Sequence, residues 1–339
     1  MQTTGLIDLQ VNGYAGVDFN DPALDATALD HALRAMLDAG VTTCLPTLIT
    51  AAEPVLAERF AALDRAVANS RLGPLMVPGF HLEGPFLNPT PGFAGCHPPN
   101  AMLPPDSALL ERLMAPLTRP VLLVTLAPEQ PGGMALVAWA KARGILVAIG
   151  HSAADHAAVA AAAQAGATLS THLGNALPHT LPKFRNPLIA QLAEDRLAAS
   201  FIADGVHIPP PALKVLLRAK GLSRAILVTD ATAAAATPPG LYRFAGMSIE
   251  HASDGSVREP GSHVLAGSAL RLDQAVRNLV AWGLTTPADA IRLASANPGA
   301  LLAHALAAHG IALPEGSVTW SPKLMPLHVY VGSEHHRVA

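Results

Sequence analysis

Residues 120–150 read PVLLVTLAPEQPGGMALVAWAKARGILVAIG and contain one complete unit of the repeat that decides the fold. The apolar runs 121–126 and 145–149 each have the length of a β-strand. The segment 134–143 between them has the length of a helix and ends before Gly144, a residue type that commonly terminates helices. A helix between two apolar strands is typical of a crossover that leaves the strands parallel. This stretch therefore predicts an α/β fold.

The same unit recurs along the chain. Apolar runs of strand length occur at 6–9, 41–45, 77–82, 121–126, 145–149, 168–171, 199–202 and 225–228. Helical spacing follows the first of them, with Asp25 as the expected N-cap and Gly40 as the expected end of the helix. Eight strands, each followed by a helix, predict a (β/α)8 TIM barrel, whose chemistry lies at the carboxyl ends of the strands.

The composition is that of a globular protein with a large aliphatic core. Of the 339 residues, 50% are hydrophobic and 14% are charged, which excludes a disordered or fibrous chain. The net charge of −3 and the pI of about 6.6 indicate no basic surface, so we expect no nucleic-acid partner. No apolar run approaches the roughly 18 residues of a spanning helix, so we also expect no membrane partner.

The cellular compartment follows from the N-terminus and the cysteines. Residues 1–8 contain no basic segment followed by an apolar one, so no secretory signal is expected. Cys44 and Cys96 are the two cysteines, too few for a disulfide scaffold. We therefore expect a cytoplasmic protein.

The pattern changes after about residue 240. The segment from 241 is typical of a β-hairpin around Asp254 and Gly255, and the last residues return to short strand-like runs. We expect a barrel domain over 1–310, with a β-hairpin insertion near 241–265, and a short C-terminal β-like tail over 311–339.

Residues with reactive side chains follow several predicted strands. Glu83 follows the third strand, His151 the fifth, His172 the sixth and Asp230 the eighth. A carboxylate and two imidazoles suit Zn²⁺ or Fe²⁺, and three protein ligands leave a position open for water, as in catalytic sites. We predict Glu83, His151 and His172 as metal ligands. Asp230 is predicted as the unligated carboxylate that takes and returns protons.

A structural alternative exists for each of these residues alone. A histidine at a strand end is often only hydrogen-bonded, and an aspartate there is often a helix N-cap. The catalytic interpretation is favoured because several different strands place such residues at the same end of the barrel.

Six motifs carry a family resemblance. They are His81-Leu-Glu-Gly-Pro-Phe86, Ile149-Gly-His-Ser152, Ser170-Thr-His-Leu-Gly-Asn-Ala176, Ile202-Ala-Asp-Gly-Val-His207, Leu227-Val-Thr-Asp-Ala231 and Leu265-Ala-Gly-Ser268. In this order, from Gly5 to about Pro298, the sequence resembles the N-acetylglucosamine-6-phosphate deacetylase family of the amidohydrolase superfamily. The resemblance implies the same barrel and the same three metal ligands.

The resemblance also implies roles in catalysis. It makes Asp230 the general base that later protonates the leaving amine. It places Cys96 and His97 beside the acetyl group and the sugar, with His97 polarising the amide carbonyl. The alternative for His97 is a loop histidine beside two prolines.

The residues that the resemblance assigns to the sugar phosphate pocket are Asn175, Ala176, His207, Leu265, Ala266 and Gly267. The family's phosphate-contacting arginine is replaced at the matching place by Lys183, with Arg185 two residues further on. Lysine binds phosphate as a point charge and lacks the bidentate fork of arginine.

The first strand ends differently from that of many amidohydrolases. Those enzymes carry His-x-His there, which supplies a second metal, whereas this chain has Gln10-Val-Asn12. The resemblance therefore implies one divalent metal ion per chain, either Zn²⁺ or Fe²⁺. Gln10 and Asn12 either line the site and bind water or substrate, or satisfy the backbone at the strand end.

Three further expectations concern the small β domain, Glu129 and the oligomeric state. The usual family member has β structure before the first barrel strand, which this chain nearly lacks, so we expect a small β domain that is reduced or absent. Glu129 is expected to bind other side chains rather than the metal. The family also implies a homodimer, with the phosphate pocket near the interface.

The expected function is hydrolysis of the N-acetyl group of N-acetylglucosamine 6-phosphate to glucosamine 6-phosphate and acetate. The closest alternative is a deacylase of another N-acyl amino sugar or its phosphate. A non-catalytic sugar-phosphate-binding relative is disfavoured because the ligands and the proton-transfer residue are all present. A two-metal hydrolase of nucleobases or cyclic amides needs histidines where Gln10 and Asn12 stand.

Overall fold

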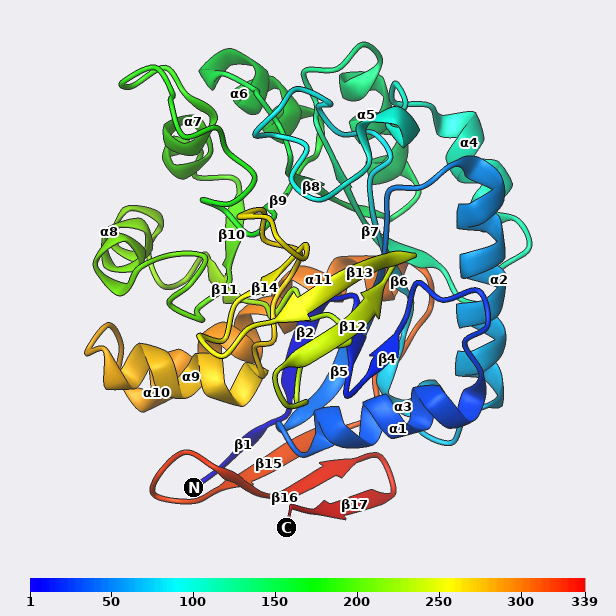
Figure 1. Ribbon diagram of the computed structural model, residues 1–339, viewed down its shortest axis with the longest axis vertical. Helices are drawn as coiled ribbons and strands as arrows, with labels where there is room; N and C mark the ends of the chain where they lie inside the picture. Colours follow the sequence, from blue (N-terminus) through cyan, green and yellow to red (C-terminus); the bar gives the residue numbers. More distant parts are fainter. Residues whose placement is uncertain (339) are drawn as a thin grey trace.

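The computed structural model describes residues 1–338, and within them one parallel sheet follows the predicted order of strands (Figure 1). Its strands are β2 (Leu6–Val11), β5 (Val41–Ile49), β6 (Phe80–Glu83), β7 (Val121–Leu126), β8 (Leu146–Ile149), β9 (Leu169–Ser170), β10 (Ala198–Phe201) and β11 (Ala225–Leu227). Each pairs in parallel with the next, and the predicted TIM barrel is confirmed. The third strand begins later than predicted because Val77 ends the short helix α3 (Gly73–Met76).

The barrel closes between its first and last strands. Val11 forms a parallel bridge with Ala231, just beyond β11. The amide of Asp230 donates to the carbonyl of Gln10 at 2.9 Å, and the amide of Asn12 donates to that of Ala231 at 2.7 Å. Closure therefore brings the ends of β2 and β11 side by side, although more than 200 residues separate them in the sequence.

Helices surround the barrel (Figure 1). Besides α3 they are α1 (Ala26–Leu37), α2 (Glu53–Asn69), α4 (Ser107–Met114), α5 (Gly133–Ala142), α6 (His156–Ala165), α7 (Pro187–Ala193), α8 (Pro210–Lys220), α9 (Leu272–Ala281), α10 (Pro287–Ala294) and α11 (Ala296–Ala308). Asp25 caps α1 as predicted, because its side chain accepts from the amide of Ala28. None of the helices within residues 1–338 combines the length and the apolar character needed to cross a membrane.

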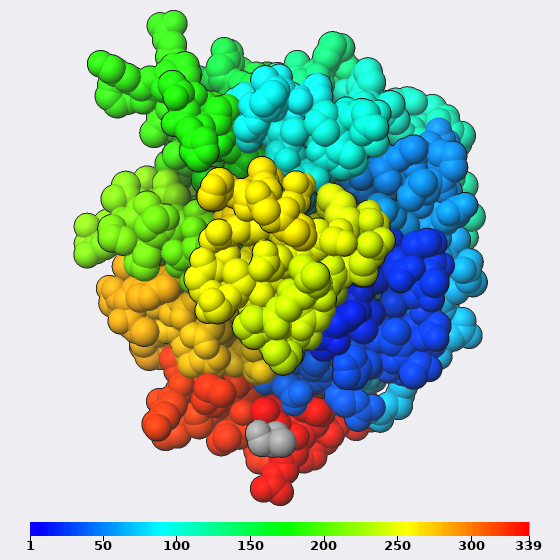
Figure 2. Space-filling view, in the orientation of Figure 1, coloured from blue at the N-terminus to red at the C-terminus, as the bar shows by residue number. Residues whose placement is uncertain are grey.

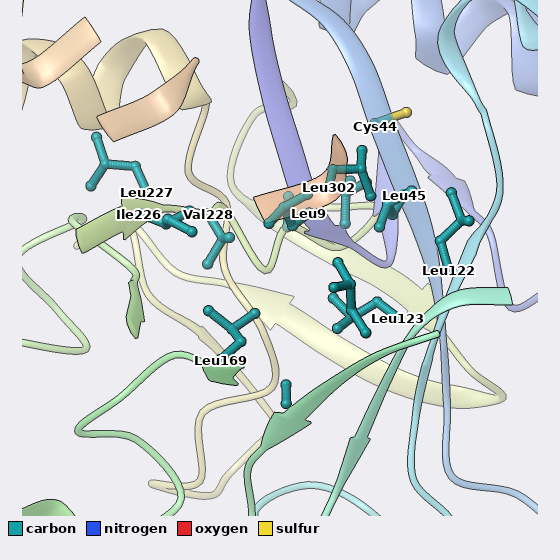
Figure 3. Packing of buried hydrophobic residues seen from close by; sticks show 14 of the residues in the cluster. Leu9, Cys44, Leu45, Leu122, Leu123, Leu169, Ile226, Leu227, Val228 and Leu302 are labelled. Atoms are coloured by element: carbon teal, nitrogen blue, oxygen red, sulfur yellow. The ribbon is translucent and has the colours of Figure 1, made fainter. Parts of the chain in front are cut away.

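The core fills the barrel and the layer beneath the helices. Side chains from strands around the barrel, among them Leu9, Leu45, Leu123 and Leu169, gather near its axis together with Leu302 of α11 (Figure 3). Helix α11 contacts β2, β7 and β11, and Asn297 donates to the carbonyl at the first residue of β11. The amino end of the barrel is thus closed by α11, and a site is left to the opposite end.

A small antiparallel sheet lies across the front of the barrel in the view of Figure 1. It consists of β12 (Gly240–Phe244), β13 (Met247–His251) and β14 (Val257–Arg258). The turn expected at Asp254 and Gly255 joins β13 to β14, whereas β12 and β13 are joined through Ala245 and Gly246. Ala245 and Gly246 both have positive φ. Glycine favours this conformation but alanine does not, so the sequence does not predict a turn at Ala245.

The two ends of the chain form a second antiparallel sheet. Strand β1 (Gln2–Thr4) pairs with β15 (Gly316–Trp320), which is followed by β16 (Pro326–Val331) and β17 (Glu334–Arg337). The indole of Trp320 donates to the hydroxyl of Thr3 at 2.8 Å. A small β layer is therefore present, and the N-terminal residues contribute one strand to it. A short hairpin of β3 (Gly13–Tyr14) and β4 (Val17–Asp18) follows β2.

Candidate functional site

A cavity of about 390 Å³ opens at the carboxyl ends of the barrel strands. The predicted site residues on its wall are Asn12, Glu83, Cys96, His97, His151, His172, Asn175, Ala176, His207, Asp230, Leu265 and Gly267. Phe244 of β12 and Val264 also line it, so the small front sheet forms one side of the cavity. Residues predicted from separate strand ends are thus brought together.

Glu83 is the centre of a buried cluster of histidines. Its Oε1 lies 3.0 Å from Nε2 of His172 and 3.4 Å from Nε2 of His151. Its Oε2 lies 3.6 Å from Nε2 of His97. Burial alone raises the pKa of Glu83, but the neighbouring imidazoles of His151, His172 and His97 hold that pKa well below its usual range. The carboxylate is therefore the charged ligand of the cluster.

The most compact set of possible metal ligands differs by one residue from the predicted set. One ligand atom each from Glu83, His97 and His151 all lie within 4.8 Å of one another. His172 is hydrogen-bonded to Glu83 and completes the cluster. The site thus offers a carboxylate and two imidazoles, with a third imidazole in contact with the carboxylate.

The hydrogen bond of His151 to the backbone indicates that a cation fits this cluster. Its Nδ1 lies 2.8 Å from the carbonyl oxygen of Phe93, which only accepts, so Nδ1 carries the proton of the neutral ring. Its Nε2 then presents a lone pair to Glu83. Two buried acceptors that face each other require a proton or a cation between them. The donor set therefore suits a divalent metal ion.

Three of these side chains sit on strained backbone at strand ends. His151, His172 and Asp230 have φ values of 51°, 27° and 49°. Such left-handed conformations cost on the order of 1–3 kcal/mol for residues other than glycine, and they persist only where the surroundings hold them. Here the surroundings do so through hydrogen bonds: the amide of His172 donates to the hydroxyl of Ser200, and the carbonyl of Asp230 accepts from the amide of Ser268.

Asp230 is held by the two amide side chains from the end of β2. Its Oδ1 accepts from Nδ2 of Asn12 at 2.7 Å and from Nε2 of Gln10 at 3.2 Å. Burial raises the pKa of Asp230 to about 6, with a further contribution from the charge of Glu83. Gln10 lies behind the cavity wall, whereas Asn12 forms part of it. The sequence predicts two alternative roles for Gln10 and Asn12, contact with water or substrate and contact with the backbone. Neither of these roles includes a contact with Asp230.

His207 is oriented by a neighbouring carboxylate. Its Nδ1 donates to Oδ2 of Asp204 at 2.6 Å, so Nε2 is left for contacts in the cavity. Burial raises the pKa of Asp204, but the hydrogen bond from His207 outweighs this effect and the pKa is lowered. Asp204 therefore fixes both the tautomer and the orientation of His207.

A polar layer inside the barrel lies beneath the cluster. His81 is fully buried, its Nε2 lies 2.8 Å from the hydroxyl of Thr125, and Thr125 lies 2.9 Å from the hydroxyl of Thr171. Burial lowers the pKa of His81 to about 4. The structure places His81 below the cavity rather than on its wall.

The expected phosphate contacts are placed differently. Lys183 and Arg185 are exposed and lie off the cavity wall, on the segment 177–186. This segment, bright green in Figure 2, projects from the molecule and carries Phe184, whose exposed fraction is 75%. His179, at the start of the same stretch, lines the cavity and was not predicted. Ala266 is buried behind the wall.

Comparison with known proteins places the chain in a family. Residues 1–304 match the amidohydrolase family. N-acetylgalactosamine-6-phosphate deacetylase of Escherichia coli O157:H7 is 37% identical over 298 residues, which are 87% of this chain and 76% of that protein. N-acetylglucosamine-6-phosphate deacetylase of Bacillus subtilis (strain 168) is 31% identical over 325 residues, or 93% of this chain and 77% of that protein.

Solved structures agree with these matches. The N-acetyl-D-glucosamine-6-phosphate deacetylase of Mycobacterium smegmatis superimposes with a TM-score of 0.87 at 29% identity, over 99% of this chain and 87% of that one. A mutant of that enzyme in complex with N-acetyl-D-glucosamine-6-phosphate gives the same TM-score of 0.87 at 28% identity, over 98% of this chain and 86% of that one. The family resemblance is confirmed. The chain belongs to the amidohydrolase family and, within it, to the N-acetylglucosamine-6-phosphate deacetylases.

Proposed function

We propose that this chain is a metal-dependent deacetylase that converts N-acetylglucosamine 6-phosphate and water to glucosamine 6-phosphate and acetate. The observation that carries the proposal is the meeting of Glu83, three histidines and Asp230 in one cavity at the carboxyl end of the barrel. Relatives that match most of the chain bear the name of this activity.

The proposed metal site holds one divalent ion per chain, either Zn²⁺ or Fe²⁺, on Glu83, His151 and His172. When bound, such an ion polarises an amide carbonyl and lowers the pKa of water to about 7. His97 competes with His172 for the third position, because it belongs to the compact group with Glu83 and His151. The variants His97→Ala and His172→Ala decide between them: removal of the true ligand lowers the metal content per chain.

The proton transfer is assigned to Asp230. Water adds to the carbonyl carbon of the N-acetyl group, and the Asp230 carboxylate takes the proton that water loses. The C–N bond then breaks, and Asp230 gives the proton to the amine nitrogen. With His172 as the third ligand, the protonated Nε2 of His97 donates to the carbonyl oxygen, and its Nδ1 lies 2.8 Å from the Thr50 hydroxyl.

The sugar phosphate is proposed to bind along Cys96, Asn175, Ala176, His207 and the turn 265–267. All of these except Ala266 lie on the cavity wall. Lys183 and Arg185 are proposed as phosphate contacts that reach the ligand by movement of 177–186 or from a neighbouring copy. Lys183→Ala and Arg185→Ala are expected to lower kcat/KM for the phosphorylated sugar and to leave that for the unphosphorylated sugar unchanged.

A second substrate has support of its own. The relative from Escherichia coli with 37% identity is named for N-acetylgalactosamine 6-phosphate, the C4 epimer. The deciding experiment measures kcat/KM on both epimers and on unphosphorylated N-acetylglucosamine, with bound metal quantified in the same sample. Preference for N-acetylglucosamine 6-phosphate with about one metal per chain supports the proposal, and preference for its C4 epimer supports the second substrate. Inactivity on all three sugars by metal-loaded protein overturns it.

A cytoplasmic homodimer completes the proposal. Cys44 and Cys96 are free thiols, which supports a reducing compartment. The exposed ring of Phe184 on the projecting segment supports contact with a second copy. Light scattering is expected to give a dimer for the wild type and a monomer for Phe184→Ser. A monomeric wild type contradicts the dimer.

A further inference from the structure

We infer that Gln10 and Asn12 are positioning residues that fix the carboxylate of Asp230 in one orientation. This inference rests on the proton-transfer role proposed above. Both side-chain amides donate to the same oxygen, Oδ1 of Asp230. The other oxygen, Oδ2, accepts no hydrogen bond from residues 1–338. The carboxylate is therefore anchored at one oxygen and free at the other.

Burial makes this anchoring effective. The exposed fraction is 2% for Gln10 and 1% for Asn12, so water does not compete for the carboxylate at these donors. Hydrogen bonds to a charged acceptor are stronger than neutral ones, and a surrounding of low polarity strengthens them further. Two such donors on one oxygen oppose rotation of the carboxylate about its Cβ–Cγ bond.

The barrel seam supplies the geometry. Gln10 lies near the end of β2 and Asn12 directly follows this strand, and the side chains of both reach Oδ1 of Asp230. The backbone of the same two residues pairs with Asp230 and Ala231: the amide of Asp230 donates to Gln10, and that of Asn12 donates to Ala231. The strand pairing that closes the barrel therefore holds the side chains of Gln10 and Asn12 next to the carboxylate of Asp230.

The consequence concerns which oxygen carries the proton. With Oδ1 engaged, Oδ2 is the oxygen that accepts the proton from water and delivers it to the amine. Loss of the donors frees the carboxylate to rotate, and misplacement of a catalytic group by about 1 Å can cost about 100-fold in rate. The donors also favour the charged form of Asp230. The other titratable groups whose charges interact with it are Glu83, His172, His207, Asp8 and Cys96, and all of them remain in every variant below.

The kinetic test uses the metal-loaded full chain with Gln10→Leu, Asn12→Leu and the double variant. We expect kcat to fall at least about 10-fold in each single variant, with KM changed less than about threefold. The lower limb of the pH profile of kcat/KM is expected to move to higher pH, with metal content unchanged. The matched control is Gln191→Leu, since Gln191 is also a buried amide but donates to Pro187 in α7. It is expected to leave kcat and the pH profile unchanged.

Crystal structures of the same metal-loaded proteins give a readout that needs no activity. We expect one orientation of the Asp230 carboxylate in the wild type and in Gln191→Leu, and a rotated or divided carboxylate in the variants at Gln10 and Asn12. An unmoved carboxylate, or variants with wild-type kcat, overturns the inference. If the wild type hydrolyses no N-acetyl amino sugar, the proposed function fails, and the orientation of Asp230 in these structures still decides the positioning role.

Discussion

The carboxylate of Glu129 accepts a hydrogen bond from the hydroxyl of Ser152 at 2.6 Å, directly beside His151. It also accepts from the amide of Ala153 at 2.6 Å and from the side chain of Asn88 at 2.9 Å. The backbone N–H of Asn88 in turn donates to the backbone carbonyl of His151. Glu129 therefore ties together both sides of the strained turn that presents His151 to Glu83.

Replacement of Glu129 by glutamine is expected to weaken metal binding. A glutamine side chain has one acceptor oxygen in place of two. Its NH₂ group would therefore face Ser152, Ala153 or Asn88, which are themselves donors. Loss of such a supporting contact typically costs about 10–100-fold in metal affinity. Competition with a chromophoric chelator measures this loss. Glu111→Gln, at an exposed ion pair with Arg143, is the control; equal affinities for both variants contradict the supporting role.

Asp230→Asn is expected to lower kcat by about 10²- to 10⁴-fold, because an amide cannot take a proton from water. Metal content is expected to stay at the wild-type value, since Asp230 is not among the proposed ligands. Single-turnover kinetics with metal analysis of the same preparation test both statements. Asp254→Asn, in the turn before β14, is the control and retains activity. Loss of metal together with activity in Asp230→Asn contradicts the assignment.

The pH dependence of kcat/KM follows from the same residue. Burial raises the pKa of Asp230 to about 6, and only the ionised carboxylate acts as a base. The value of kcat/KM is therefore expected to increase with pH and then to level off. The midpoint of this increase is expected at or below about 6, since a bound cation lowers the pKa of a nearby carboxylate. A profile of kcat/KM between pH 4.5 and 8.5 measures this midpoint. A kcat/KM that decreases as the pH is raised from 4.5 to 6 contradicts the role of Asp230 as a base.

Much of the fold is visible in the sequence because the barrel repeats one local unit. Each strand is an apolar run, and residues such as Asp25 mark the helix starts, so local pattern and final structure agree. The terminal sheet is different. Strand β1 has three residues and pairs with β15, where Thr3 faces Val318. Two short segments so far apart in the sequence can pair without any pattern in the residues around them that would predict the pairing.

The site was predictable where a residue lies at the carboxyl end of a strand. Glu83 is the last residue of β6 and His172 comes two residues after β9, and the barrel brings all strand ends to one rim. His97 lies in a long loop after β6, so no periodicity indicated that its imidazole contacts Glu83. The contacts of Gln10 with Asp230 depend on the register at barrel closure, which the sequence does not determine.

The fold is expected to depend on Lys220, whose side chain is fully buried at the end of α8. Its Nζ donates to the carbonyls of Gln191 and Glu194 at 2.8 and 2.9 Å, at the end of α7. Lys220→Met leaves both carbonyls unsatisfied, so the free energy of unfolding is expected to fall by about 2–4 kcal/mol. Urea denaturation measures it, with the exposed Lys214→Met as control; equal stabilities of the two variants contradict the role of Lys220.

Removal of the metal is expected to lower the unfolding temperature. Glu83 is a buried carboxylate surrounded by imidazoles, and a cation bound to the native cluster but not to the unfolded chain stabilises the fold. At a free metal concentration of 100 times Kd this stabilisation amounts to about 2.7 kcal/mol. Calorimetry with and without a chelator measures it. His151→Ala removes a ligand proposed in both possible sets, so its unfolding temperature is expected not to respond to the chelator. A wild type that is equally insensitive contradicts metal binding at this cluster, whereas a response that survives in His151→Ala places the stabilising ion elsewhere.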